Sequence, residues 1–463
     1  MLAGGQVEGT AKSMPGSGLD RTRGGIVRNL LVLAWPIASS FGLYSVGSLV
    51  DMMWVGHLGP EYIAGVGSAA MALWLGLAGA MGIGVGARAL VARLTGAGDL
   101  EGANRATQQA LLAAGVYGLL VALLASFFAE PILRLVGVDE AVVSKGATYM
   151  RIFAFSALPS SLWIVLEAVM QASGDVIRPL LMTVASKLVH AVVEPLFIFG
   201  WLFFPALGVK GAALTYVVTE SIGFIAGVWI VLNGHTRLRF TLSRFRLELK
   251  TIWRIVRIGL PAVLFSAQGS LASLVFLRLI APFGTTAVAA HNLGLRVEGL
   301  IMMPMGGMSL AAAVLVGQNL GAKQPARAEK GAWVAIGLVE IFTAVVATAI
   351  LVFAPNIVRI FNPEPELIGL ASGFLRIAAA GYFAVGVFTV LQNCLNGAGD
   401  TLPPTMITLL ITWLVQVPLA FFLPTFTGLA AYSVRWGILM GWVVAAVVYV
   451  LYFRLGKWKR KRV

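Results

Sequence analysis

Twelve long apolar runs constrain this chain more than any other feature. Each approaches or exceeds the ~20 residues that a helix needs to cross the hydrocarbon core of a bilayer. The runs are continuously apolar and contain glycine and proline, unlike the alternating strands of a membrane barrel. The sequence therefore predicts an all-α polytopic membrane protein with twelve transmembrane helices. We expect them at roughly 28–55, 62–87, 106–128, 147–172, 180–204, 208–232, 254–280, 286–317, 330–353, 370–397, 404–423 and 429–453.

The scarcity of charge supports the same class. Charged residues make up 12% of the 463 residues and the mean hydropathy is +0.88, whereas soluble domains carry about 25% charged residues. This excludes a soluble enzyme, a disordered protein and a nucleic-acid-binding module. No GxxxxGK[ST] loop is present, which argues against ATP-driven transport. Because Cys394 is single and the histidines are scattered, we expect no disulfide, no metal site and no cofactor.

Basic residues predict the orientation in the membrane. The tails and the even-numbered loops hold 24 Lys and Arg residues, so we expect both termini in the cytoplasm. The net charge of +14 is thus mostly an orientation signal. We expect a cytoplasmic N-terminal tail at 1–27 without a signal peptide, a basic cytoplasmic linker at 233–253 and a basic tail at 454–463. The odd-numbered loops hold only five basic residues, namely Arg134, Lys145, Lys210, Arg359 and Arg435.

The two halves of the chain match each other at one constant offset. Because six spans per repeat is an even number, both repeats start on the same side and are related by a pseudo-two-fold axis along the membrane normal. We therefore expect an N-lobe at 28–232 and a C-lobe at 254–453, which suits lobes that rock about a central cleft. A duplicated scaffold without a moving cleft is the alternative. Matching positions include Pro36 and Pro261, Gly59 and Gly284, Gly96 and Gly321, and Gly174-Asp175 and Gly399-Asp400.

Carboxylates within the spans distinguish the two halves. A charged side chain at the centre of a bilayer costs about 2.5–3.5 kcal/mol on insertion scales, so each one needs a reason. The first half has four such acids, and their counterparts in the second half are Phe276, Gln392, Leu419 and Ala445. Ion coupling is therefore predicted in the N-lobe. The four acids are Asp51, Glu167, Glu194 and Glu220.

Four residues are the candidates for carrying the coupling cation. Desolvation favours the neutral form of a carboxylate, so Asp51 can take up a proton if it is buried; an acid wetted by lipid headgroups is the alternative. His190 and Glu194 are four apart and share a helix face, as a proton-sensitive pair or as a structural hydrogen bond. Glu220 is a further candidate, unless it pairs with Lys187 or Glu167 within the bundle.

Candidates in the C-lobe are fewer. Glu298 is expected to pair with Arg278 as a structural lock between spans 7 and 8. Met302 and Met303 follow on the same span. Flexible thioethers suit a pocket that admits varied substrates, although methionine also occurs in helices that face lipid.

Several short motifs, in this order and spacing, resemble the multidrug and toxic compound extrusion (MATE) family over essentially the whole chain. The resemblance is closer to the branch of DNA-damage-inducible protein F than to the Na⁺-coupled branch. The motifs are Pro36…Ser48-Leu-Val-Asp51-Met-Met-Trp54-Val-Gly56, Arg88…Gly96-Ala-Gly-Asp99, Gly174-Asp175…Arg178-Pro179, Glu194-Pro-Leu-Phe-Ile-Phe-Gly200, Val316-Gly-Gln-Asn-Leu-Gly-Ala322 and Asn396-Gly-Ala-Gly-Asp400-Thr.

The resemblance implies a V-shaped antiporter with two six-helix lobes that moves by a rocker switch. The family's first-helix acid falls on Asp51. Its fifth-helix Asn-x-x-x-Asp falls on His190 and Glu194, which keeps the acid and replaces the amide. The seventh-helix glutamate of the Na⁺-coupled branch falls on Gly269. With these matches, the residues expected to line a substrate cleft are Tyr44, Trp54, Thr215, Gln268, Met302 and Met303.

The resemblance implies an efflux antiporter, not an enzyme, that exports cationic or amphipathic organic compounds in exchange for H⁺ or Na⁺. H⁺ is favoured because the seventh-helix carboxylate is missing. The alternative is a flippase for a lipid-linked or polyprenyl-phosphate substrate on a related fold. We expect a multi-pass protein of the plasma (cell inner) membrane that acts as a monomer, with a small organic substrate, the lipid bilayer and no nucleic acid as partners.

Overall fold

The computed structural model of the chain describes residues 21–136, 140–201, 204–233, 236 and 246–461. Every regular element in these ranges is helical, and twelve segments are long and apolar enough to cross a membrane. This confirms the predicted all-α polytopic class with twelve transmembrane helices. Most of the predicted tail 1–27 and the middle of the predicted linker 233–253 lie outside the described residues.

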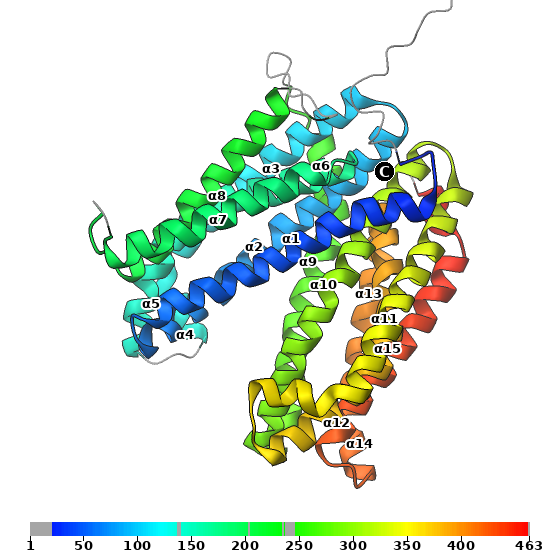
Figure 1. Cartoon of the computed structure of the whole chain (residues 1–463). Coiled ribbons are helices and arrows are strands. Elements are labelled where there is room, and N and C mark those ends of the chain that lie inside the picture. Colours follow the sequence, from blue (N-terminus) through cyan, green and yellow to red (C-terminus); the bar gives the residue numbers. More distant parts are fainter. Residues whose placement is uncertain (1–20, 137–139, 202–203, 234–235, 237–245, 462–463) are drawn as a thin grey trace, which may run out of the picture.

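The helices of the first half form one bundle (Figure 1). Its spans are α1, the part of α2 from Gly65, α3, the segment Gly146–Ala172, α7 and α8. The helices are α1 (Ile26–Gly56), α2 (Pro60–Gly96), α3 (Leu100–Phe127), α4 (Ala129–Val136), α5 (Glu140–Phe153), α6 (Ala157–Ala172), α7 (Ile177–Phe199) and α8 (Val209–Leu232).

The second half forms the other bundle. Its spans are α9 with the short turn after it, α10, α11, α12, the segment Leu402–Phe426 and α15. The helices are α9 (Leu249–Ile280), α10 (Thr285–Gly321), α11 (Pro325–Phe361), α12 (Pro365–Gly397), α13 (Leu402–Ile411), α14 (Val417–Phe426) and α15 (Ala431–Arg454).

Two spans are interrupted. Between α5 and α6 the chain forms a 3₁₀ turn at Ala154–Ser156, so the fourth span is two helices joined end to end. Between α13 and α14 it forms a π-helical stretch, Thr412–Gln416, just before Pro418. A proline lacks the N–H that would continue the ladder of the preceding turn, which explains a local change of helix type there.

The two bundles meet at the end that carries the first described residues and the C-terminus, and their ribbons diverge toward the other end (Figure 1). Glycines permit the contact. A Cβ added to Gly259 of α9 would overlap the carbonyl oxygen of Gly82 in α2. A Cβ added to Gly86 would overlap the Ile255 carbonyl oxygen in the same way. Backbones therefore touch directly between the bundles.

The repeat seen in the sequence is also present in the backbone. Gly59 and Gly284, which the repeat pairs, both have a positive φ, 118° and 100°. Gly174 and Gly399, another pair of the repeat, have φ of 95° and 80°. Glycine adopts this region without the steric cost of a Cβ, so the turns after matching helices have the same geometry in both halves.

Candidate functional site

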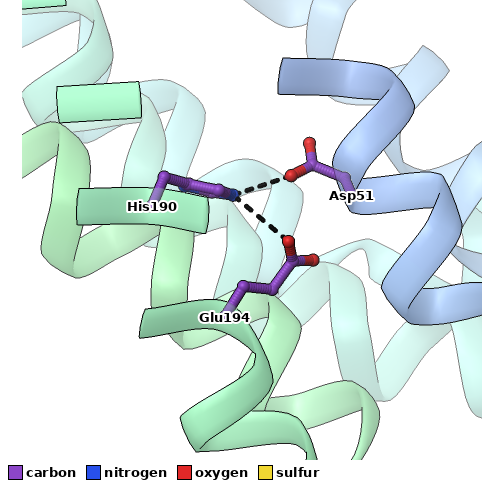
Figure 2. A group of neighbouring side chains, drawn as sticks. All are labelled: Asp51, His190 and Glu194. Carbon is purple, nitrogen blue, oxygen red and sulfur yellow. Dashed lines mark hydrogen bonds and ion pairs between the residues drawn. The ribbon is translucent and has the colours of Figure 1, made fainter. Parts of the chain in front are cut away.

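Asp51 and His190 come from different helices and meet inside the first bundle. Asp51 lies near the C-terminal end of α1, and His190 lies in the second half of α7. His190 Nε2 is 2.8 Å from Asp51 Oδ1, and the two side chains are 3% and 15% exposed. Figure 2 shows the imidazole pointing at the carboxylate across the gap between the helices.

Glu194 completes the cluster from one turn further along α7. Its Oε2 is 3.9 Å from His190 Nε2, as the spacing of four residues predicts for one helix face (Figure 2). Its side chain is 1% exposed, and neither carboxylate oxygen has a hydrogen-bond partner among the described residues. An ionised carboxylate without hydrogen bonds is costly in such a place, so it requires an accompanying positive charge.

Two residues of α8 support the cluster, and the sequence did not single out either of them. The Tyr216 hydroxyl donates to Asp51 Oδ2, and its ring packs edge-on against the His190 imidazole at 4.6 Å between centroids. The Thr219 hydroxyl lies 2.9 Å from His190 Nδ1. Thr219 and Tyr216 are three apart, so both side chains project from one face of α8 toward the site.

The hydrogen bonds of Thr219 allow two arrangements of the protons on His190. Thr219 Oγ1 lies 2.8 Å from the Thr215 carbonyl oxygen and 2.9 Å from His190 Nδ1, and it can donate its one hydrogen to either. When it donates to Nδ1, a neutral His190 carries its proton on Nε2 and donates to Asp51 Oδ1. When it donates to the Thr215 carbonyl oxygen, it accepts from Nδ1, and the Asp51 contact is a hydrogen bond only with a further proton on Nε2 or on Asp51.

The formal charge of the cluster follows from these groups. Two ionised carboxylates and a neutral imidazole sum to −2. Two monovalent cations or one divalent cation would bring the site to neutrality. Low-dielectric surroundings favour a neutral site, because an unpaired buried charge is strongly penalised.

Glu220 is not part of this cluster. Lys187 Nζ lies 3.4 Å from Glu220 Oε1, and their side chains are 14% and 11% exposed. This is the pairing that the sequence left open as an alternative. Lys187 also lies over the ring of Tyr44, 5.1 Å from its centroid.

Tyr44 joins this pair to a second polar group deeper in the bundle. Its hydroxyl accepts a hydrogen bond from Trp163 Nε1 at 2.7 Å and donates to Glu167 Oε2 at 3.4 Å. Glu167 Oε1 in turn accepts from Gln171 Nε2 at 3.0 Å, and Arg88 donates to Gln171 at 3.3 Å. The series therefore runs from the middle of α1 toward the turn between α6 and α7.

The second bundle contains a cavity of about 230 Å³. Its lining combines polar and aromatic residues, among them Gln268, Glu298, Phe276 and Trp442. Gln268, predicted to line the substrate cleft, is 8% exposed, and its Oε1 has no partner among the described residues. The cluster of Asp51, His190 and Glu194, called the Asp51 cluster below, lies in the first bundle, so this cavity is separate from it.

The predicted pair of Glu298 with Arg278 is wrong. Glu298 Oε1 instead accepts a hydrogen bond from Arg435 Nη1 at 2.8 Å, and Arg435 Nη2 donates to the His291 carbonyl oxygen at 3.2 Å. Arg435, which the sequence assigned to an outer loop, is 3% exposed within α15. Gly294 explains the contact, because a Cβ there would lie 2.5 Å from Arg435 Nη2.

The other residues predicted to line the cleft do not gather at one place. Trp54 packs among aromatic rings, with Phe199 at 6.0 Å and Trp201 at 6.3 Å between centroids. Thr215 is buried and donates to the Gly211 carbonyl oxygen of its own helix, so Thr219, not Thr215, is the hydroxyl at His190. Met302 and Met303 are partly buried on α10.

The sequence predicted no metal site because its histidines are far apart along the chain. The fold nevertheless groups His190 with two carboxylates. One ligand atom from each of Asp51, His190 and Glu194 lies within 4.8 Å of the other two. Separation in the sequence was therefore a poor guide to separation in space.

A family model described as MatE matches the chain twice, over residues 36–196 and 261–422. The second match begins at Pro261, the residue that the sequence repeat pairs with Pro36 at the start of the first match. Asp51, His190 and Glu194 all lie within the first match.

Known relatives cover nearly the full chain. The Probable multidrug resistance protein YoeA of Bacillus subtilis is 27% identical over 96% of this chain and 96% of its own length. The Probable multidrug resistance protein NorM of Thermotoga maritima is 24% identical over 95% and 94%. A solved multidrug resistance MATE family transporter in an outward-facing conformation has a TM-score of 0.88 at 25% identity, over 96% of this chain and 99% of that one. These names are those of resistance proteins and transporters, which confirms the expectation that the chain is not an enzyme.

Proposed function

Since the chain belongs to the MatE family, we propose that it is a secondary active antiporter exporting cationic or amphipathic organic compounds in exchange for H⁺. The names of its relatives support efflux of such compounds. The grouping of Asp51, His190 and Glu194 supports H⁺ as the coupling ion most directly, because it places two buried carboxylates beside an imidazole, and all three side chains can bind protons. The coupling group would be Asp51, His190 and Glu194.

The residue at position 269 also supports H⁺ over Na⁺. Gly269 stands where the resemblance places the seventh-helix glutamate of the Na⁺-coupled branch, so the chain has no carboxylate there. This agrees with a place closer to the branch of DNA-damage-inducible protein F. Two protons would neutralise the Asp51 cluster, and each charge that crosses the membrane contributes about 2.3 kcal/mol per 100 mV.

Transport would proceed by alternating access between an N-lobe at 28–232 and a C-lobe at 254–453. With the diverging end open, protons would enter the Asp51 cluster and the bound compound would leave. Neutralising the cluster would change the contacts among α1, α7 and α8, and the lobes would then rock to open the other end. The polar series through Lys187, Tyr44, Glu167 and Gln171 offers a route by which the protons leave toward the cytoplasm.

The setting follows from the charge distribution. The excess of Lys and Arg in the tails and even-numbered loops supports cytoplasmic termini and a place in the plasma (cell inner) membrane. Both lobes lie in one chain, so a monomer would suffice. No organic cofactor is needed for this cycle.

No observation favours the alternative, a flippase for a lipid-linked or polyprenyl-phosphate substrate. Such a substrate needs unpaired cations along its path. Lys187, a basic residue within the spans, is neutralised by Glu220.

Transport by purified protein in liposomes tests the proposal. Ethidium and a panel of other cationic dyes would be loaded, and their movement followed under an imposed pH gradient alone and under a Na⁺ gradient alone. We expect dye movement with the pH gradient and none above background with the Na⁺ gradient. Movement driven only by Na⁺ would reject H⁺ coupling, and movement of none of the compounds under either gradient would reject the antiport function.

A further inference from the structure

The Asp51 cluster has the composition of a metal site as well as that of a proton site. We propose that Asp51, His190 and Glu194 bind one divalent transition-metal ion of the Zn²⁺ class, and that this ion and protons exclude each other. Bound metal would occupy the positions that protons need. Binding of the ion by these three side chains does not depend on any transport activity.

The ligand atoms are close enough to converge on one ion. They lie within 4.8 Å of one another, with His190 Nε2 at 2.8 Å from Asp51 and 3.9 Å from Glu194. Zn²⁺ binds nitrogen and carboxylate oxygen at about 2.0–2.2 Å, so its tetrahedral ligands are about 3.4 Å apart. The present separations of 2.8 Å and 3.9 Å from His190 Nε2 lie on either side of that spacing, so metal binding would require Asp51 and Glu194 to adjust their side chains.

The imidazole is already arranged as a metal ligand. Metal-binding histidines usually donate their other ring N–H to an oxygen, which fixes the tautomer and orients the ring. Thr219 Oγ1 lies 2.9 Å from Nδ1, and in the tautomer in which it accepts from Nδ1 the lone pair of Nε2 points toward the two carboxylates. Tyr216 similarly fixes the second oxygen of Asp51 and leaves Oδ1 toward the centre.

Glu194 supplies an independent sign that a ligand is expected. Its side chain is 1% exposed, and both oxygens lack a hydrogen-bond partner among the described residues. The cluster has a formal charge of −2 with both acids ionised, which one divalent cation cancels. A single Na⁺ would leave one charge uncompensated.

The chemistry of the ligands selects the class of metal. One imidazole and two carboxylates suit Zn²⁺, Co²⁺, Mn²⁺ or Fe²⁺, whereas Ca²⁺ and Mg²⁺ prefer sites made only of oxygen ligands. Three protein ligands also leave a position for water, as in open zinc sites. The soft thiolates that would favour Cu⁺ are absent from the three residues.

Protons should compete with the metal, because the ligands bind metal only when deprotonated. The other titratable groups around the cluster are Tyr216 of α8, Tyr149 of α5, and the Lys187–Glu220 pair across α7 and α8. The paired lysine and glutamate cancel each other. The charge available to attract the ion is therefore that of Asp51 and Glu194.

Cobalt binding to the purified, untagged full-length protein tests the proposal. Co²⁺ would be titrated at neutral pH and followed by its visible absorption, which reports coordination, and Zn²⁺ would then be added to displace it. The test variants are His190→Asn and Thr219→Val. Matched controls are His57→Asn and His291→Asn, which alter an accessible and a buried histidine elsewhere. Metal-free thermal unfolding of each variant checks that it is folded.

We expect one Co²⁺ per chain, full displacement by Zn²⁺, and weaker binding as the pH falls. His190→Asn should abolish the absorption, and Thr219→Val should weaken affinity by about 10–100-fold, the usual cost of losing such a supporting hydrogen bond. Both controls should bind as the wild type. The proposal would be overturned if the wild type did not bind Co²⁺, if both test variants bound it as tightly as the wild type, or if a control lost binding. None of these outcomes depends on transport, so the antiport proposal would survive them.

Discussion

The ion pair of Glu298 and Arg435 illustrates how much a single contact can matter inside a membrane protein. Arg435 is 3% exposed and holds α15 against α10 through Glu298 and the His291 carbonyl oxygen. Removing one member of a buried pair leaves the other charge uncompensated. Replacing both members by apolar residues removes the charges together and is often nearly neutral.

Arg435→Met should therefore destabilise the protein by about 3–5 kcal/mol. The double variant Arg435→Met/Glu298→Met should recover most of that loss, and Arg278→Met should have little effect because Arg278 is exposed. Thermal unfolding in detergent checks the order of the four proteins. A double variant as unstable as Arg435→Met would contradict the pairing.

At this scale the sequence predicted what depends on spacing along one helix. His190 and Glu194 share a face of α7 because they are four residues apart, and that expectation is met. The Glu298 partner could not be predicted, because Arg435 is 137 residues away and the contact depends on the missing side chain of Gly294. Thr219 was missed for a similar reason: it and Thr215 lie on one stripe of α8, and only the packing of α7 on α8 selects between them.

Whole elements meet where glycines remove side chains. Gly82 and Gly86 of α2 face Ile255 and Gly259 of α9 at backbone distance. The same contact must separate if the lobes rock. A side chain at this contact would therefore destabilise the arrangement in which α2 and α9 touch, and it would not affect an arrangement in which they are apart.

Gly259→Val should shift the population away from this arrangement. Overpacking costs about 1–3 kcal/mol, which corresponds to roughly a 5- to 150-fold change in population. Spin labels at the exposed positions Leu135 and Phe426, on the diverging ends of the two bundles, report it in a Cys394→Ala background. We expect the distance between the labels to shorten.

Gly337→Val is the matched control for this shift, because a Cβ at Gly337 meets nothing within 4 Å. Its distance distribution should equal that of the parent protein. An unchanged distribution in Gly259→Val, or an equal shift in both variants, would show that the α2–α9 contact does not set the arrangement.

Apolar length predicted the number of spans but not their internal breaks. The 3₁₀ turn at Ala154–Ser156 and the π-helical stretch at Thr412–Gln416 lie within continuously apolar runs. Pro418 and Pro424 gave a signal for irregularity in the second of these spans. Pro159, three residues after the 3₁₀ turn, gives a comparable signal in the first.

For the whole molecule, orientation in the membrane decides which way the diverging end points. The charge distribution predicts that this end faces outward, because the first and the last described residues lie at the other end. Arg435 should not have been counted among the outer charges, and its removal strengthens the asymmetry. The diverging ends of the two bundles would then face the outside of the cell.

Cysteine labelling in intact cells checks this orientation. In a Cys394→Ala background, a membrane-impermeant maleimide should label Leu135→Cys and should label Lys457→Cys only after the cells are permeabilised. Both native side chains are exposed, so access is not limited by burial. Labelling of Lys457→Cys in intact cells would place the C-terminus outside.

The repeat predicted two similar halves, and their differences predicted which half holds the coupling group. Asp51, Glu194 and Glu220 lack acidic counterparts, and two of them meet at His190. The sequence left open whether Glu220 pairs with Lys187, with Glu167 or with neither, and the structure shows the pair with Lys187. The pattern of charges in the sequence thus indicated the lobe in which Asp51, His190 and Glu194 meet, whereas packing between α1, α7 and α8 determined which side chains meet there.

Substrate-driven proton movement measures the central claim most directly. Liposomes with a pH-sensitive dye inside would receive a gradient of a cationic compound that the wild type transports, with no other ion gradient. The wild type should move protons against the compound, Asp51→Asn and Glu194→Gln should not, and Glu340→Gln, which alters a carboxylate in the other lobe, should behave as the wild type. Full proton movement by folded Asp51→Asn protein would contradict the assignment of the coupling site.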